Sequence, residues 1–244
     1  MTSCSIPAEG GRAGVLRATW DRRGTTWHQH VFESSIFDDI RSAVTEAACL
    51  TGTERVVDLG AGGGFLALEI APRVAEVVAV DVSEGMLERL RADARARHIT
   101  NVDVHVADLA GFDLPAHSVD VVVSNYALHH LTDADKSALL VRAQAWLKPG
   151  GRLVIADMMF GRGGSSRDRQ ILAEKVMVLL RKGPGGIWRI AKNLVRFGLR
   201  RGSELPSPPE FWVDAIRSAG FRFVEYRAVA AEAGLVTAVS PPGR

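Results

Sequence analysis

The segment from Val56 to Gly64 constrains the fold of this chain more than any other part of its sequence. It reads VVDLGAGGG, which is a short β-branched run, an acidic residue and then four glycines within five positions. Residues that favour helix follow at 65–70. This order predicts a strand, a tight glycine turn and a helix. Such a turn exposes backbone amides and a helix N-terminus to a ligand that approaches more closely than a side chain would allow.

A second strand with a terminal acid supports this interpretation. The β-branched run 77–80 ends at Asp81, about 20 residues beyond the turn, where nucleoside-binding folds place a carboxylate for the ribose. The glycines are spaced Gly-x-Gly-x-Gly from Gly60, and Phe65 stands where a dinucleotide-binding sequence has its third glycine. A nucleoside without a pyrophosphate does not need that glycine. The spacing therefore favours such a ligand, and a tight turn without a ligand is the alternative.

The composition is that of an ordinary folded domain. The 244 residues are 47% hydrophobic and 24% charged, with a net charge of +2. No run reaches the roughly 18 apolar residues of a membrane span, and residues 1–14 lack a signal-peptide core, so we expect a cytoplasmic location. Cys4 and Cys49 are far apart and belong to no Cys-x-x-Cys pair, so we expect neither a metal site nor a disulfide.

Strands and helices alternate after the glycine turn, which predicts a parallel sheet with helical crossovers. We expect helices at 27–50, 83–97, 132–147 and 208–219, and strands at 77–80, 102–107, 119–124 and 153–156. The sequence KPGG at 148–151 predicts a turn. Two final strands at 221–229 and 235–239 have only a short connection, so they can pair only as antiparallel neighbours.

These segments together resemble the class I S-adenosylmethionine-dependent methyltransferases. The motifs that carry the resemblance are VVDLGAGGG, VVAVDVSEGML, VHVADLAGFDLP, SVDVVVSNYALHHLTD and LKPGGRLVIAD, in this order. They are similar in style to the small-molecule branch that includes the ubiquinone and menaquinone biosynthesis methyltransferases. The resemblance implies an α/β fold with a Rossmann-like seven-stranded sheet, mostly parallel with the last strand antiparallel, and helices on both faces.

The resemblance also implies a domain plan. Residues 1–50 would form an N-terminal tail and lid helices, and residues 51–244 would form the methyltransferase domain. A basic helical insertion is expected at 160–205, between the fifth strand and the final helix.

S-adenosylmethionine is the cofactor that the resemblance implies. By position, it assigns the cofactor-binding residues as Asp58, Gly60, Gly62, Gly64, Asp81, Val82, Met86, Asp108 and Asn125. Asp81 would accept hydrogen bonds from both ribose hydroxyls, and Asp108 would accept one from the adenine amino group. Val82 and Met86 would cover the adenine, and the glycines would admit the methionine part. Asp81 and Asp108 also have an ordinary alternative role as caps at the ends of strands or helices.

A methyl group on a sulfonium is already activated, so the protein must mainly orient the acceptor and remove its proton. His129 follows the fourth strand four residues after Asn125, and a neutral imidazole there could act as the base. Tyr126 is a competing candidate, and packing is the alternative role for His129. The sequence NYALHH is not typical of the quinone branch at this position, so the identity of the methyl acceptor stays open.

The expected insertion carries the unusual charge of this chain. Residues 160–205 hold eight Arg and three Lys against three acids, a net charge of +8, so the rest of the chain is near −6. Within 187–201, apolar and basic residues would lie on opposite sides of a helix. This pattern fits a solvated lid, an anionic substrate or peripheral contact with an anionic membrane. Nucleic acid is not expected, because few aromatic residues are interleaved.

The function expected from the sequence is transfer of a methyl group from S-adenosylmethionine to a small-molecule acceptor. Two alternatives remain open. An NAD(P)-dependent oxidoreductase is disfavoured by Phe65 in the glycine turn. A non-catalytic module that binds the nucleoside and regulates a partner would share Gly60, Gly62 and Asp81, and only methyl release would distinguish it.

Overall fold

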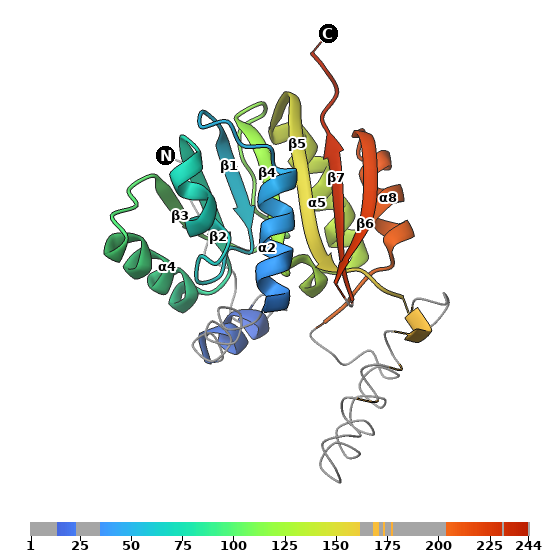
Figure 1. Cartoon of the computed structure of the whole chain (residues 1–244), viewed down its shortest axis with the longest axis horizontal. Helices are drawn as coiled ribbons and strands as arrows, with labels where there is room; N and C mark the ends of the chain where they lie inside the picture. The colour runs from blue at the N-terminus through green and yellow to red at the C-terminus, as the bar shows by residue number, and fades with distance from the viewer. Residues whose placement is uncertain are drawn as a thin grey trace.

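One seven-stranded sheet organises the molecule (Figure 1), in a computed structural model that describes residues 14–22, 35–161, 168–170, 173, 177, 204–230 and 232–243. The strand order is β3-β2-β1-β4-β5-β7-β6. Strands β1 to β5 are parallel, whereas β7 is antiparallel to both β5 and β6. The strands are β1 (Arg55–Leu59), β2 (Glu76–Asp81), β3 (Val102–Val106), β4 (Val119–Asn125), β5 (Leu147–Met158), β6 (Arg222–Ala230) and β7 (Ala233–Val239). The fold class predicted from the sequence is confirmed.

Helices cover both faces of this sheet (Figure 1). One face carries α2 (Ser35–Ala47), α3 (Ala67–Ile70) and α4 (Glu84–Ala96). The opposite face carries α5 (Asp133–Trp146) and α8 (Pro209–Ser218). Two short 3-10 turns, η1 (Ala71–Arg73) and η2 (Leu128–His130), follow α3 and β4.

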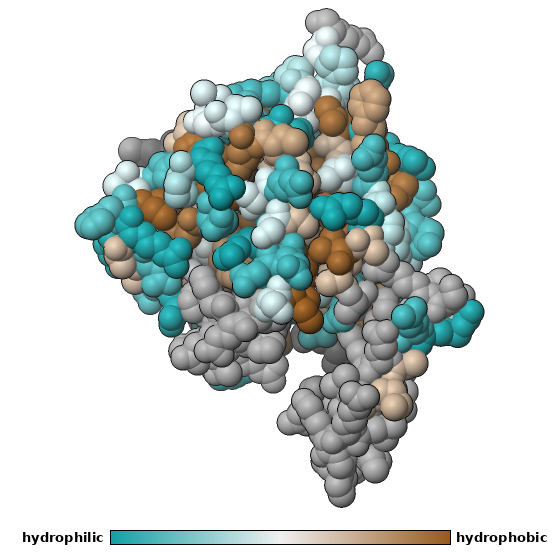
Figure 2. All heavy atoms as spheres, in the orientation of Figure 1, coloured by the Kyte–Doolittle hydropathy of each residue, from teal (hydrophilic) through white to brown (hydrophobic). Residues whose placement is uncertain are grey.

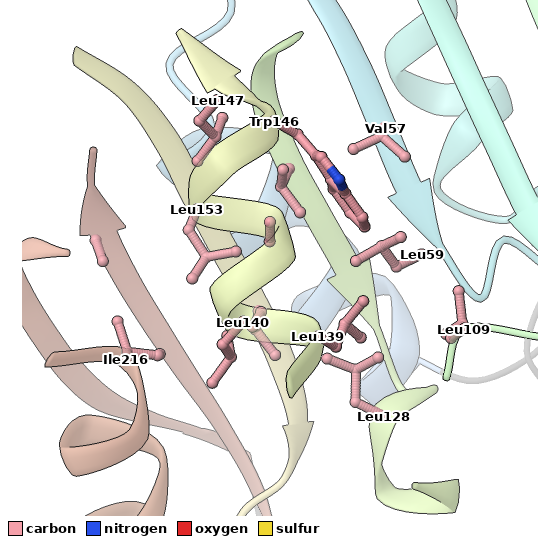
Figure 3. Close-up of a cluster of buried hydrophobic side chains, with 14 of the residues drawn as sticks. Val57, Leu59, Leu109, Leu128, Leu139, Leu140, Trp146, Leu147, Leu153 and Ile216 are labelled. Atoms are coloured by element: carbon pink, nitrogen blue, oxygen red, sulfur yellow. The ribbon is translucent and has the colours of Figure 1, made fainter. Parts of the chain in front are cut away.

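Alternation along the strands divides the core into two clusters. Successive side chains of a strand point to opposite faces, so Val57 packs with Trp146 on the α5 side while Val56 packs with Ile40 on the α2 side. Figure 3 shows α5 lying over β4 and β5, with the side chains of Trp146, Leu139 and Leu140 in the buried cluster. Each such fully buried side chain contributes roughly 1.5–3 kcal/mol. The two clusters hold the strand ends, and therefore the site, in fixed positions.

Local sequence signals set the ends of the helices as expected. Ser83 is the N-cap of α4 and accepts a hydrogen bond from the Met86 N–H, while Thr132 caps α5 through the Asp135 N–H. Helix α8 begins at Pro209, and Gly220 follows its end with a φ of 98°.

Two elements differ from expectation. The KPGG segment lies within β5, which starts at Leu147, because the extra residues are absorbed as a register shift against Val119 and Val121 of β4. The helix expected at 27–50 is described only from Ser35, and it ends at Ala47 because Cys49 adopts a φ of 47°. Most of the expected insertion at 160–205, including 187–201, lies outside the described residues.

The face that carries α2 mixes hydrophilic and hydrophobic residues without one continuous apolar area (Figure 2). In the part of the chain that the structure describes, none of the helices has the length and apolar character needed to cross a membrane.

Candidate functional site

The glycine turn follows β1 at the carboxyl edge of the sheet. Gly60 adopts a φ of 79°, and a Cβ atom there would lie 2.1 Å from the Ala127 Cβ, so only glycine allows this turn to approach the loop after β4. Gly64 has a φ of 88°, and its Cβ would lie 2.9 Å from side-chain atoms of both Leu68 and Leu90. The lack of a side chain at Gly64 therefore allows the neighbouring helices to pack closely, and the lack of one at Gly60 allows two loops to approach each other.

Asp81, at the end of β2, holds this turn in place. One carboxylate oxygen accepts a 2.9 Å hydrogen bond from the Gly62 N–H, and the other accepts one of 2.9 Å from the Ser83 N–H. Burial raises the pKa of Asp81 above its ordinary value, although these backbone hydrogen bonds act in the opposite direction. The carboxylate thus joins the glycine turn to the start of α4.

Asp58 and Asn125 present buried acceptor atoms to the same region. The Asp58 side chain is 1% exposed, and its Oδ2 has no hydrogen-bond partner among the described residues. Burial, and then the negative charge of Asp81, raise the pKa of Asp58 to about 7. The Asn125 Oδ1 likewise lacks a partner within the described ranges. Buried acceptors in native proteins are nearly always satisfied, so two that face one cavity indicate a ligand with hydrogen-bond donors.

These groups line a cavity of about 120 Å³ at the carboxyl ends of the central strands. In open α/β sheets this edge is where ligands bind. Eight of the predicted cofactor-binding residues line it, namely Asp58, Gly60, Gly62, Asp81, Val82, Met86, Asp108 and Asn125. Asp108 also accepts a 3.0 Å hydrogen bond from the Ala110 N–H, which fits its alternative role in shaping the loop. Gly64 and His129 do not line the cavity.

His129 lies behind the cavity wall, where Asp157 holds it. Its Nδ1 is 2.6 Å from the Asp157 Oδ1, and its backbone N–H donates a 2.8 Å hydrogen bond to the Asp157 Oδ2. Asp157, at the end of β5, is completely buried. The neighbouring His130 lines the cavity instead, with its ring 4.2 Å from that of His129. The role of His129 as a base stays a prediction, and its partner Asp157 was not identified from the sequence.

Tyr126 also lines the cavity, in an unusual conformation. Its φ is 57°, a value that non-glycine residues rarely adopt and that is often found at functional sites. Its ring packs edge-on against Phe37 at 5.0 Å and against His129 at 5.8 Å. Burial, and then the negative charges of nearby acids, raise the pKa of Tyr126 above its ordinary value. The phenol is therefore neutral at physiological pH.

A helical segment at 14–22 completes the cavity wall; it lies within the expected N-terminal tail and lid helices of residues 1–50, but none of its residues was predicted to line the site. In Figure 1 it is the unlabelled, darker blue helix below α2, beside the carboxyl ends of the parallel strands. Leu16 and Trp20 line the cavity, and the Trp20 ring lies 5.4 Å from that of His130. The Ser83 hydroxyl donates a hydrogen bond to Asp21. The apolar residues Leu16 and Trp20, four positions apart and so on one face of a helix, were the available signal for this contact.

Comparison with known proteins agrees with this geometry. Residues 56–151 match the family described as a methyltransferase domain. An uncharacterized methyltransferase of Mycobacterium bovis is 37% identical over 113 residues, which cover 46% of this chain and 55% of the relative. Phosphoethanolamine N-methyltransferase 1 of Triticum aestivum is 32% identical over 114 residues, which cover 46% of this chain and 23% of the relative.

The crystal structure of the [4+2]-cyclase SpnF superposes with a TM-score of 0.71 and 16% identity, covering 98% of this chain and 99% of that one. This likeness concerns the fold alone, because one fold can host unrelated chemistry. The chain spans about half the length of several curated relatives that it matches, from 46% to 55%. Residues 56–151 therefore match a methyltransferase domain, and the strand order and the motifs agree with the resemblance of the chain to the class I S-adenosylmethionine-dependent methyltransferases.

Proposed function

We propose that this chain transfers a methyl group from S-adenosylmethionine to a small-molecule acceptor. The observation that carries the proposal is the single cavity that gathers the glycine turn, Asp58, Asp81 and Asn125 at the carboxyl edge of the sheet. Two buried acceptor oxygens there lack partners among the described residues, and a cofactor with hydroxyl and ammonium donors would satisfy them.

The cofactor fits these residues in chemical character. Asp81 would accept hydrogen bonds from the ribose hydroxyls, and the Asp58 carboxylate would attract the ammonium group of the methionine part. Met86 and Val82 would contact the adenine, with Asp108 accepting from its amino group. When bound, the cofactor supplies a methyl carbon that is already activated towards nucleophiles.

The chain itself must then orient the acceptor and receive a proton. We propose His129 for this role, because a carboxylate at its Nδ1 fixes one tautomer and leaves Nε2 able to accept a proton. His130 is the second candidate, since its side chain lines the cavity. Separate glutamine substitutions would distinguish them, because only loss of the base should lower kcat without weakening cofactor binding.

A small-molecule acceptor is supported by the name of the wheat relative, which acts on phosphoethanolamine. Similarity to the branch that includes the ubiquinone and menaquinone methyltransferases remains a proposal, and it rests only on the sequence motifs. A cytoplasmic location with peripheral membrane contact through 187–201 is likewise proposed from the charge pattern of the sequence.

The test is methyl release. The purified chain is incubated with S-adenosylmethionine carrying a deuterated methyl group and a metabolite extract, and labelled products are detected by mass spectrometry. The Asp81→Ala variant serves as the control for cofactor-dependent labelling. Cofactor binding without any labelled product would favour the regulatory module, and hydride transfer from NADH would favour the oxidoreductase.

A further inference from the structure

Aromatic rings form one side of the cavity, and they come from three separate segments. Trp20 belongs to the helical segment 14–22, Phe37 to α2, and Tyr126 and His130 to the loop after β4; we call these four residues the aromatic wall. Phe37 and Tyr126 meet edge-on at 5.0 Å, and Trp20 and His130 meet at 5.4 Å. The faces of Trp and Tyr rings attract organic cations, by about 0.5–2 kcal/mol per contact.

Two chain segments bring acidic residues to the loop after β4, which carries Tyr126 and His130 of the aromatic wall. Asp157 at the end of β5 is bonded to His129, whose ring contacts Tyr126 at 5.8 Å. The backbone N–H of Leu205 donates a 2.6 Å hydrogen bond to the His129 carbonyl, which places the preceding Glu204 beside the same loop.

A third acid arrives from the turn between β6 and β7. The Glu232 carbonyl accepts a 2.9 Å hydrogen bond from the Met159 N–H, just beyond the end of β5. Burial raises the pKa of Tyr126, and the charges of Glu232, Asp157 and Glu204 raise it further. All three carboxylates therefore act on the Tyr126 side of the cavity.

No Lys or Arg side chain lines the cavity among the described residues, and its acidic lining residues are Asp58, Asp81 and Asp108. The Arg41 guanidinium lies 4.4 Å over the Phe65 ring and is bonded to Asp38 at 2.8 Å. A negative field favours a cation and opposes both an anionic acceptor and a developing alkoxide.

We propose that the methyl acceptor is an amine that binds against the aromatic wall as an ammonium ion. This inference rests on the proposed methyl transfer. The ammonium first gives one proton to the imidazole that serves as the base, which is His129 or, as the second candidate, His130. The nitrogen lone pair then forms a bond to the methyl carbon as the carbon–sulfur bond breaks, and that electron pair returns to sulfur. The products are a methylated amine, which can bind as a cation, and the neutral thioether of the cofactor.

Matched acceptor panels test the proposal. Amines, alcohols, phenols and carboxylates with the same carbon skeletons are incubated with the protein and deuterated S-adenosylmethionine, and products are assigned by mass spectrometry. We expect label on nitrogen only. Glu204→Gln should raise KM for the labelled amine about threefold to tenfold by removing one attractive charge, with kcat nearly unchanged. Glu225→Gln, an exposed change on β6, should leave KM unaltered.

Label on oxygen or carbon, or no labelled amine while the cofactor binds normally, would overturn the amine proposal. Equal KM values for Glu204→Gln and wild type would also overturn it, because the negative field of the acidic residues would then not govern binding of the amine. Failure to bind S-adenosylmethionine at all would instead remove the proposed function, so the two failures can be told apart by calorimetry with the cofactor.

Discussion

Replacing Asp58 with Asn should stabilise the ligand-free protein while weakening its cofactor site. The pKa of Asp58 is raised from 3.8 to about 7 by burial and by Asp81. The folded protein therefore holds a proton that the unfolded chain releases between about pH 4 and 7. Its free energy of unfolding must fall as pH rises through that window. The difference of about three pKa units corresponds to roughly 4 kcal/mol above pH 7.

Asparagine has no proton to release, so Asp58→Asn avoids this loss. We expect its advantage over wild type to reach up to roughly 4 kcal/mol at pH 8 and to shrink by about 1.4 kcal/mol per unit between pH 7 and 5. Urea unfolding at several pH values measures it. Asp214→Asn, on the exposed side of α8, is the control and should show no such trend. A stability difference independent of pH would refute the reasoning.

Three further predictions address the turn, the base and the basic segment. Gly60→Ala should cost about 1–3 kcal/mol of unfolding free energy in urea titrations, because its Cβ would collide with Ala127, whereas Gly111→Ala, which meets nothing within 4 Å, should be neutral. His129→Ala should lower kcat about 10²–10⁴-fold in steady-state assays with S-adenosylmethionine affinity nearly intact, and a loss below threefold would exclude it as the base. The protein should sediment with anionic vesicles at low salt and be released at high salt, and glutamine at four basic positions of 187–201 should abolish this: Arg189, Lys192, Arg196 and Arg200. Indifference to such vesicles would reject membrane contact.

Local patterns in the sequence predicted most of the framework. The β-branched runs, the cap at Ser83 and the stop at Gly220 each act within a few residues, so their consequences can be read along the chain. The glycine turn and Asp81 were also predicted together, because the strand–turn–helix–strand order fixes their separation.

Contacts between distant segments could not be predicted in this way. Asp157 and His129 are 28 positions apart in the sequence, and Trp20 and His130, whose rings are in contact, are 110 positions apart. Only the packing of β4 beside β5, and of the segment 14–22 against the strand ends, brings these side chains together. Gly64 was assigned to the cofactor from its motif, and that role stays a prediction; the sequence did not reveal that a Cβ atom there would collide with Leu68 and Leu90.

Calorimetric titration with S-adenosylmethionine tests the central claim most directly. We predict saturable binding of the cofactor and of its demethylated product. Asp81→Ala should weaken binding by about 2–4 kcal/mol, since two ribose hydroxyls would lose their acceptor. Glu69→Ala, which removes only the ion pair of α3 with Arg73, should bind like wild type. Tight binding of NADH with no heat from S-adenosylmethionine would contradict the account.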